Sequence, residues 1–272
     1  MAEMSVIWLR VAAALYSLGL LHSILAAMQR RENLFRYAVS AARAGALLHL
    51  VSIIEEGLLT GRCPVATFYE IMSMTALIIV TAFLFVHWRY KMDSFSVFLF
   101  PLVFVMTLVA AMGRPVAAWP NPAIRSAWLT THIVLVLLGY GALLLTAVSA
   151  VMYLLQEREL KRKTPRQSYY RLPPLGTLDE LISRAMAAGF VLITLATIAG
   201  STWAFIEFGT SWISDPRISV SFITWGIYLA MICLRVTAGW RGRKAAFMAI
   251  AALGGSAITW VTHNGLLRHL TQ

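Results

Sequence analysis

The sequence predicts an all-α protein, a polytopic bundle of about eight transmembrane helices with both termini on the outer, periplasmic side of the membrane. Composition gives the first reason. Apolar residues make up 59% of the 272 residues and charged residues only 13%, with a mean hydropathy of +0.73, whereas soluble domains carry about a quarter charged residues. The net charge of +11 gives the second, because its basic residues lie in short clusters between apolar runs. That pattern indicates contact with membrane lipid and excludes a nucleic-acid partner.

Apolar runs long enough to cross a bilayer occur eight times along the chain. A hydrocarbon core of about 30 Å requires roughly 20 residues of helix. The runs lie near residues 6–28, 38–59, 67–87, 95–112, 127–155, 184–206, 217–236 and 244–262. The fifth run is longer than a bilayer requires, so we expect it to tilt or protrude. No internal repeat is visible, and we expect residues 1–272 to form a single transmembrane domain.

The basic residues of the linkers predict the orientation. Arg and Lys gather in one alternating set of linkers, at positions 30–43, 89–91, 158–184 and 235–244, and are sparse in the opposite set. Cytoplasmic loops carry the excess of Arg and Lys in membrane proteins. Both termini and the segment between the sixth and seventh runs are therefore expected on the outer, periplasmic side, with the protein in a bacterial inner (cytoplasmic) membrane.

Helix ends are marked by turn residues. Gly61 and Pro64 follow the second run, and Gly113 and several prolines follow the fourth. Such residues interrupt helices because proline lacks a backbone N–H and glycine tolerates unusual dihedral angles. The sequence Leu-Gly-Thr-Leu-Asp at 175–179 is expected to start the sixth helix, with Thr177 or Asp179 as its N-cap.

Ionisable residues lie inside the predicted spans. His49 is about midway along the second run, and Glu56 follows seven positions later on the same helical face. Because ionisable groups in hydrocarbon cost at least a few kcal/mol, they face the interior of a bundle and often mark a site. The carboxylates Glu55, Glu56 and Glu70 are expected to pair with Arg62, with Arg114 or with one another.

Residues 200–225 form an external segment that is rich in tryptophan. It brings aromatic rings close to one short anion: Trp203, Phe208, Trp212 and Trp225 with Asp215. Tryptophan is common wherever a helix meets the membrane surface, so the segment could lie in the interface. The other interpretation is that its rings cover a flat apolar ligand.

Three histidines are predicted on the same side as this segment. His132 lies at the outer start of the fifth run, on one helical face with Trp128, and His263 and His269 follow the eighth run. Six positions turn a helix through about 600°, so at most one of this last pair can oppose His132. Two imidazoles from different helices are what a six-coordinate haem iron requires. A hydrogen-bonded structural role for each histidine is the alternative.

Arginines on that side are candidates to neutralise haem propionates: Arg114, Arg125 and Arg217.

Several motifs occur together in an order that resembles the CcsA/ResC/HemX-like family of haem-handling membrane proteins in cytochrome c assembly. Residues 200–225 are similar to that family's WWD segment. Four further motifs are similar to the family's pattern: Gly61-x-x-Pro64 with Tyr69-Glu70, Trp128-Leu-x-x-His132, Leu175-Gly-Thr-Leu-Asp179 and Leu234-Arg235 with Gly239-Trp240-Arg241-Gly242. The resemblance covers most of the chain.

This resemblance implies a protein that holds haem b, bound non-covalently, near the outer face for delivery to apocytochrome c. It implies His132 and His269 as ligands of the haem iron, with His263 in reserve. A CcsB/ResB-like partner is implied as well. An enzymatic part in haem attachment is left open, and no Ser/His/Asp set, phosphate loop or zinc spacing is present.

The chain departs from the family pattern at several positions. Phe208 and Ser214 stand where the segment normally has tryptophan, Ile218 replaces an acidic residue, and Cys233 stands where many members have a histidine. We expect Cys233 to pack in apolar surroundings. The weakened segment also resembles the HemX branch, which implies a regulator of haem biosynthesis acting on the level of glutamyl-tRNA reductase. A structural, haem-free membrane subunit of a respiratory complex is the third hypothesis.

Overall fold

The computed structural model describes residues 2–29, 32–65, 67–113, 127–161, 172–209 and 216–263, and within them helices are joined by short turns. The helices in these ranges are α1 (Ala2–Gln29), α2 (Glu32–Thr60), α3 (Phe68–Tyr90), α4 (Phe95–Ala110), α5 (Ala127–Leu160), α6 (Leu175–Phe208), α7 (Pro216–Thr237) and α8 (Arg243–His263). Each of the eight predicted apolar runs coincides with one of them, so the all-α class is confirmed.

Five of these helices are long and apolar enough to cross a membrane: α1, α2, α3, α5 and α6. The apolar helices α4 and α7 are shorter over the stretches searched, Phe95–Ala110 and Ser221–Thr237. A multi-pass helical membrane bundle follows from the five long helices. The full number of eight spans and the sides on which the termini lie stay predictions.

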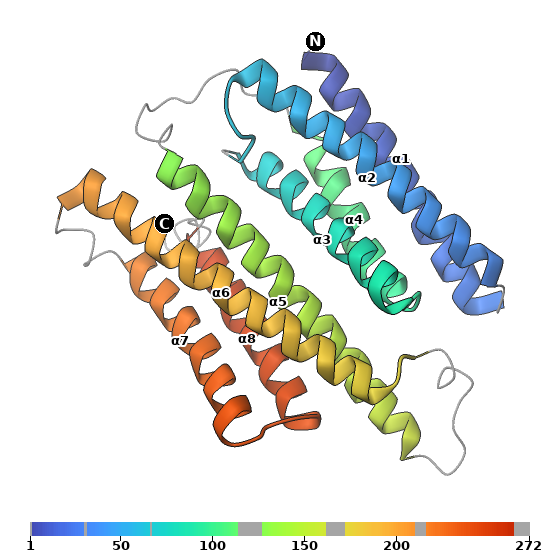
Figure 1. Ribbon diagram of the computed structural model, residues 1–272. Coiled ribbons are helices and arrows are strands. Elements are labelled where there is room, and N and C mark those ends of the chain that lie inside the picture. The colour runs from blue at the N-terminus through green and yellow to red at the C-terminus, as the bar shows by residue number, and fades with distance from the viewer. Residues whose placement is uncertain are drawn as a thin grey trace, which may run out of the picture. The chain divides into compact units, whose positions relative to one another are not determined.

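Two compact units make up the fold, Met1–Ser126 and Ala127–Gln272. In the first, α1 packs against α2 and α4, and α3 packs against α2 and α4 (Figure 1). In the second, α5 packs against α6 and α8, and α7 packs against α6 and α8. The expectation of a single domain over residues 1–272 stays a prediction.

Small residues allow close helix packing in both units. In the first unit, Gly45 on α2 faces Tyr16 on α1, and a Cβ at position 45 would lie 2.6 Å from the Tyr16 ring. In the second, Gly139 on α5 faces Ile193 on α6 in the same manner, again at 2.6 Å. Membrane helices use small residues at their interfaces because van der Waals contact, not expulsion of water, drives their association.

The sixth helix starts in the motif at 175–179 as expected, but its N-cap is a different residue. The N-cap is Pro174, with φ −57° and ψ 143°, and the helix begins at Leu175. The prediction of Thr177 or Asp179 as the N-cap was therefore wrong. A proline has the φ angle of a first helical turn already fixed, so α6 starts directly after it and Asp179 lies inside the helix.

Asp179 instead joins three parts of the second unit. Its carboxylate accepts hydrogen bonds from Arg235 Nη2 on α7 at 2.9 Å and from the backbone N–H of Gly242 at 3.1 Å. Gly242 has φ +62°, and a Cβ there would lie 2.7 Å from the Tyr153 hydroxyl. The two sequence motifs at 175–179 and 234–242 are thus parts of one contact, which sets α6, α7 and the start of α8 against each other.

Candidate functional site

His132 is the candidate iron ligand whose side chain the structure describes. It lies in the second turn of α5 and is partly buried against α6. Its Nδ1 lies 2.7 Å from the carbonyl oxygen of Ala196, which is an obligate acceptor, so Nδ1 carries the proton and donates it. The neutral ring therefore keeps its lone pair on Nε2. A ring N–H bonded to a carbonyl is the arrangement that orients metal-ligating histidines.

Gly200 makes room for this imidazole on the surface of α6. A Cβ at position 200 would lie 2.5 Å from Nδ1 and 2.7 Å from Cε1 of His132. Ala196 and Gly200 are four residues apart, so the carbonyl that holds the ring and the gap that admits it lie on one helical face. We call Ala196 and Gly200 the imidazole cradle. Sequence reasoning missed it, although a pair of small residues spaced four apart is a known signal of close helix contact.

The three candidate tryptophans whose side chains are described differ in exposure and in contacts. Trp128, one turn before His132, is 49% exposed. Trp203 lies on α6 three residues beyond Gly200 and is partly buried. Trp225 on α7 is tied to α6, because its Nε1–H donates to Thr194 Oγ1 at 3.0 Å and its ring stacks on Phe190 with centroids 6.1 Å apart. Trp225 thus helps to hold α7 against the helix that carries the imidazole cradle.

The tryptophan-rich segment is in large part helical. α6 continues to Phe208, Gly209 follows with φ +61°, and α7 begins at Pro216. Trp203 and Trp225 are therefore on helices. Trp212, Asp215, Arg114, Arg125 and His269 lie outside the described residues. The same holds for the side chains of Phe208, Arg217 and His263, whose backbones belong to α6, α7 and α8.

Cys233 is a free cysteine on α7 and is exposed on the second unit. Its packing in apolar surroundings stays a prediction, because the lipid-facing side of a membrane helix is apolar as well.

His132 fits the part of an axial ligand of a haem iron. Within the described ranges, no three His, Cys, Asp or Glu side chains come close enough to hold an ion by themselves. A porphyrin brings four equatorial nitrogens with its iron and needs only axial ligands from the protein. His132 offers one such ligand atom, Nε2, in a fixed tautomer and orientation.

The first unit contains the ion pair that the sequence predicted for Glu70. Arg62 Nη2 and Nη1 donate to the two carboxylate oxygens of Glu70 at 2.8 and 2.9 Å, and both side chains are more than nine-tenths buried. The bond to Glu70 raises the pKa of the Arg62 guanidinium, so Arg62 stays protonated. Burial raises the pKa of the neighbouring Cys63 thiol, which makes that thiol slow to react.

Comparison with known proteins matches this chain over most of its length. The family model described as cytochrome C assembly protein matches residues 45–267, a range that includes His132 and the imidazole cradle. The cytochrome c biogenesis protein CcsA of Gloeobacter violaceus is 28% identical, over 95% of this chain and 89% of its own length. The CcsA proteins of a Picosynechococcus species and of Guillardia theta are 26% and 25% identical over 76% of this chain, covering 77% and 74% of their own lengths. This chain belongs to the cytochrome c assembly protein family.

Proposed function

We propose that this multi-pass membrane protein handles haem in cytochrome c biogenesis, holding haem b non-covalently near the outer face for delivery to apocytochrome c. The observation that carries the proposal is the state of His132, whose Nδ1–H is committed to the Ala196 carbonyl and whose Nε2 keeps its lone pair. Such a bond orients metal-ligating histidines, which supports a ligand role for His132.

The proposed role of each candidate residue is as follows. His132 would hold the haem iron through Nε2, and His269, with His263 in reserve, would provide the second ligand. Trp128 and Trp203 offer apolar ring surface to the macrocycle, as do Phe208 and Trp212, and Trp225 keeps α7 in place. Arg125 and Arg217 are proposed to neutralise the propionates, and Asp215 to orient a donor in the same segment. When bound, haem supplies the vinyl groups that become linked to cysteine thiols of the acceptor.

The partners follow from this role. We propose apocytochrome c as the acceptor and a CcsB/ResB-like membrane protein as the working partner, in a bacterial inner membrane with the termini outside. The names of the relatives, all cytochrome c biogenesis proteins, support a role in that process.

A second candidate function rests on the departures in the tryptophan-rich segment. Phe208, Ser214 and Ile218 remove two indole rings and one acidic residue from the family pattern. A chain with a weaker haem surface could act instead as a HemX-like regulator of haem biosynthesis, through the level of glutamyl-tRNA reductase.

Replacing His132 with alanine in the living cell separates the two functions. We expect covalent cytochrome c, measured by haem staining of membranes, to fall at least about tenfold, because loss of a metal-site interaction costs on the order of 10–100-fold in affinity. His22→Ala is the matched control, since His22 Nδ1 also bonds a carbonyl at 2.7 Å, but within its own helix. If cytochrome c formation persists while tetrapyrrole precursors change, the regulatory function is correct and the assembly role is wrong.

A further inference from the structure

The interior of the first unit contains a buried histidine, His49, that is not part of the proposed haem site. His49 on α2 is fully buried and has a partner at each ring nitrogen. Its Nε2 lies 2.9 Å from Ser73 Oγ on α3, and its Nδ1 lies 3.4 Å from the Tyr16 hydroxyl on α1. Placing an ionisable group in a membrane helix costs free energy. Because side chains from three helices meet at the His49 imidazole, we expect this histidine to have a function.

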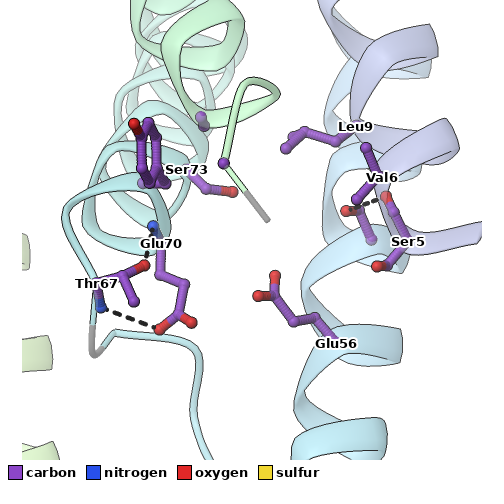
Figure 2. Close-up of a pocket in the computed structure, with 11 residues that line it drawn as sticks. Ser5, Val6, Leu9, Glu56, Thr67, Glu70 and Ser73 are labelled. Carbon is purple, nitrogen blue, oxygen red and sulfur yellow. Dashed lines mark hydrogen bonds between the residues drawn. The ribbon is translucent and has the colours of Figure 1, made fainter. Parts of the chain in front are cut away.

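Ser73 connects this histidine to a cavity. The cavity has a volume of about 30 Å³, and its lining includes Ser5, Ser52, Glu56, Thr67, Glu70 and Ser73 (Figure 2). A space of this size admits water and excludes haem or any other organic ligand. Glu56 is only partly buried and Tyr69, also in the lining, is 42% exposed, so the cavity reaches the surface of the unit.

Glu56 is the carboxyl group that remains available in this cavity. Glu70 is engaged by both terminal nitrogens of Arg62 and by the backbone N–H of Thr67. Among the described residues, Glu56 makes no side-chain hydrogen bond or ion pair, and Figure 2 shows its carboxylate directed into the space between α2 and the Thr67–Glu70 turn. Its charged neighbours there are Glu70 and Arg62, and Arg114, which follows Gly113 of the lining, lies outside the described residues.

We propose that Glu56, the cavity and Ser73 form a proton-transfer path from the surface of the first unit to His49. A proton taken up by the Glu56 carboxylate passes through water in the cavity to Ser73 Oγ, while the hydroxyl proton of Ser73 moves to His49 Nε2. One proton enters and one imidazolium forms, whose Nδ1–H donates to the Tyr16 oxygen. Return of the proton follows the same groups in reverse, and no other bond changes.

The path ends at His49 in the interior of the unit, so it loads a proton and does not conduct one across the membrane. It gives the protein a charge that can be switched within the first unit by the solution on one side. The path shares no residue with the haem site, so the two proposals stand or fall separately.

Nuclear magnetic resonance of the full-length protein, labelled with ¹⁵N-histidine in phospholipid nanodiscs, tests the path. The His49 signal is assigned by its loss in His49→Asn, and the rate at which this signal responds to a drop in pH is measured. We expect Ser73→Ala and Glu56→Gln to slow the response by about 10²-fold, the contribution typical of a positioned proton-transfer group. Ser73→Thr, which keeps the hydroxyl, should restore the rate.

Ser96→Ala is the control for packing, because Ser96 is equally buried but bonds the Asp93 carbonyl and does not line the cavity. Its response should match the unaltered protein. The path is disproved by an equal response in Ser73→Ala, by an equal slowing in Ser96→Ala, or by a His49 signal that does not respond in the unaltered protein.

Discussion

Gly200→Ala is expected to release haem from the purified protein and to lower its free energy of unfolding by about 1–3 kcal/mol, the usual cost of forcing a methyl group into a filled space. The added Cβ would lie 2.5 Å from His132 Nδ1, so the ring must leave the imidazole cradle and lose its bond to Ala196. His132 Nε2, the proposed ligand atom for the haem iron, is then moved out of position. Haem content per protein and a denaturation curve in detergent measure both effects.

Gly226→Ala provides the matched control for this substitution. Gly226 lies in α7, and a Cβ at that position meets no heavy atom within 4 Å. Alanine is favoured over glycine in a helix by up to about 1 kcal/mol, so this variant should keep its haem and gain stability. Full haem content in Gly200→Ala, with the His132 bond intact by ¹⁵N resonance, would contradict the role of the imidazole cradle.

Glu70→Ala is expected to cause the largest loss of stability, about 3–5 kcal/mol, because it leaves the buried charge of Arg62 without its partner. The same substitution removes the capping box at the start of α3, in which Thr67 and Glu70 satisfy each other's backbone N–H groups. Loss of the pair should also loosen the turn around Cys63. Because burial raises the pKa of that thiol, exposure would lower it and speed the reaction with a maleimide.

The control for Glu70→Ala is the same substitution in an exposed Glu–Arg ion pair. Glu180 and Arg184 lie four residues apart on α6 with side chains 44% and 60% exposed, and Glu180→Ala should cost under about 1 kcal/mol. The double variant Arg62→Ala/Glu70→Ala should recover part of the loss, since no unpaired charge remains. Equal costs for the two single glutamate variants would show that the Arg62–Glu70 pair does not hold the turn.

The helices could be predicted from the sequence because a bilayer imposes a simple requirement. A helix that crosses it needs a long apolar run, and the runs at 38–59 and 95–112 became α2 and α4, with ends shifted by at most six residues. The start of α6 lies outside its apolar run, so hydropathy carries no signal for it, but the motif at 175–179 predicted it. The N-cap residue was less predictable.

The candidate site was predictable in residue types but not in contacts. Trp128 and His132 could be placed on one face of a helix from their spacing alone. The bond between His132 and Ala196 joins residues 64 positions apart, and the acceptor is a backbone carbonyl, which has no residue type to recognise. Asp179 illustrates the same difficulty, since its position suggested a helix cap while its partners, Arg235 and Gly242, lie on other elements.

The axial ligands of the iron test the central claim most directly. The optical and electron paramagnetic resonance spectra of the purified, haem-loaded protein should be those of a low-spin haem b with two histidine ligands. His132→Ala should abolish that spectrum, and comparison of His269→Ala with His263→Ala should identify the second ligand. A bis-histidine spectrum that survives in His132→Ala, or a purified protein that takes up no haem, would contradict the account.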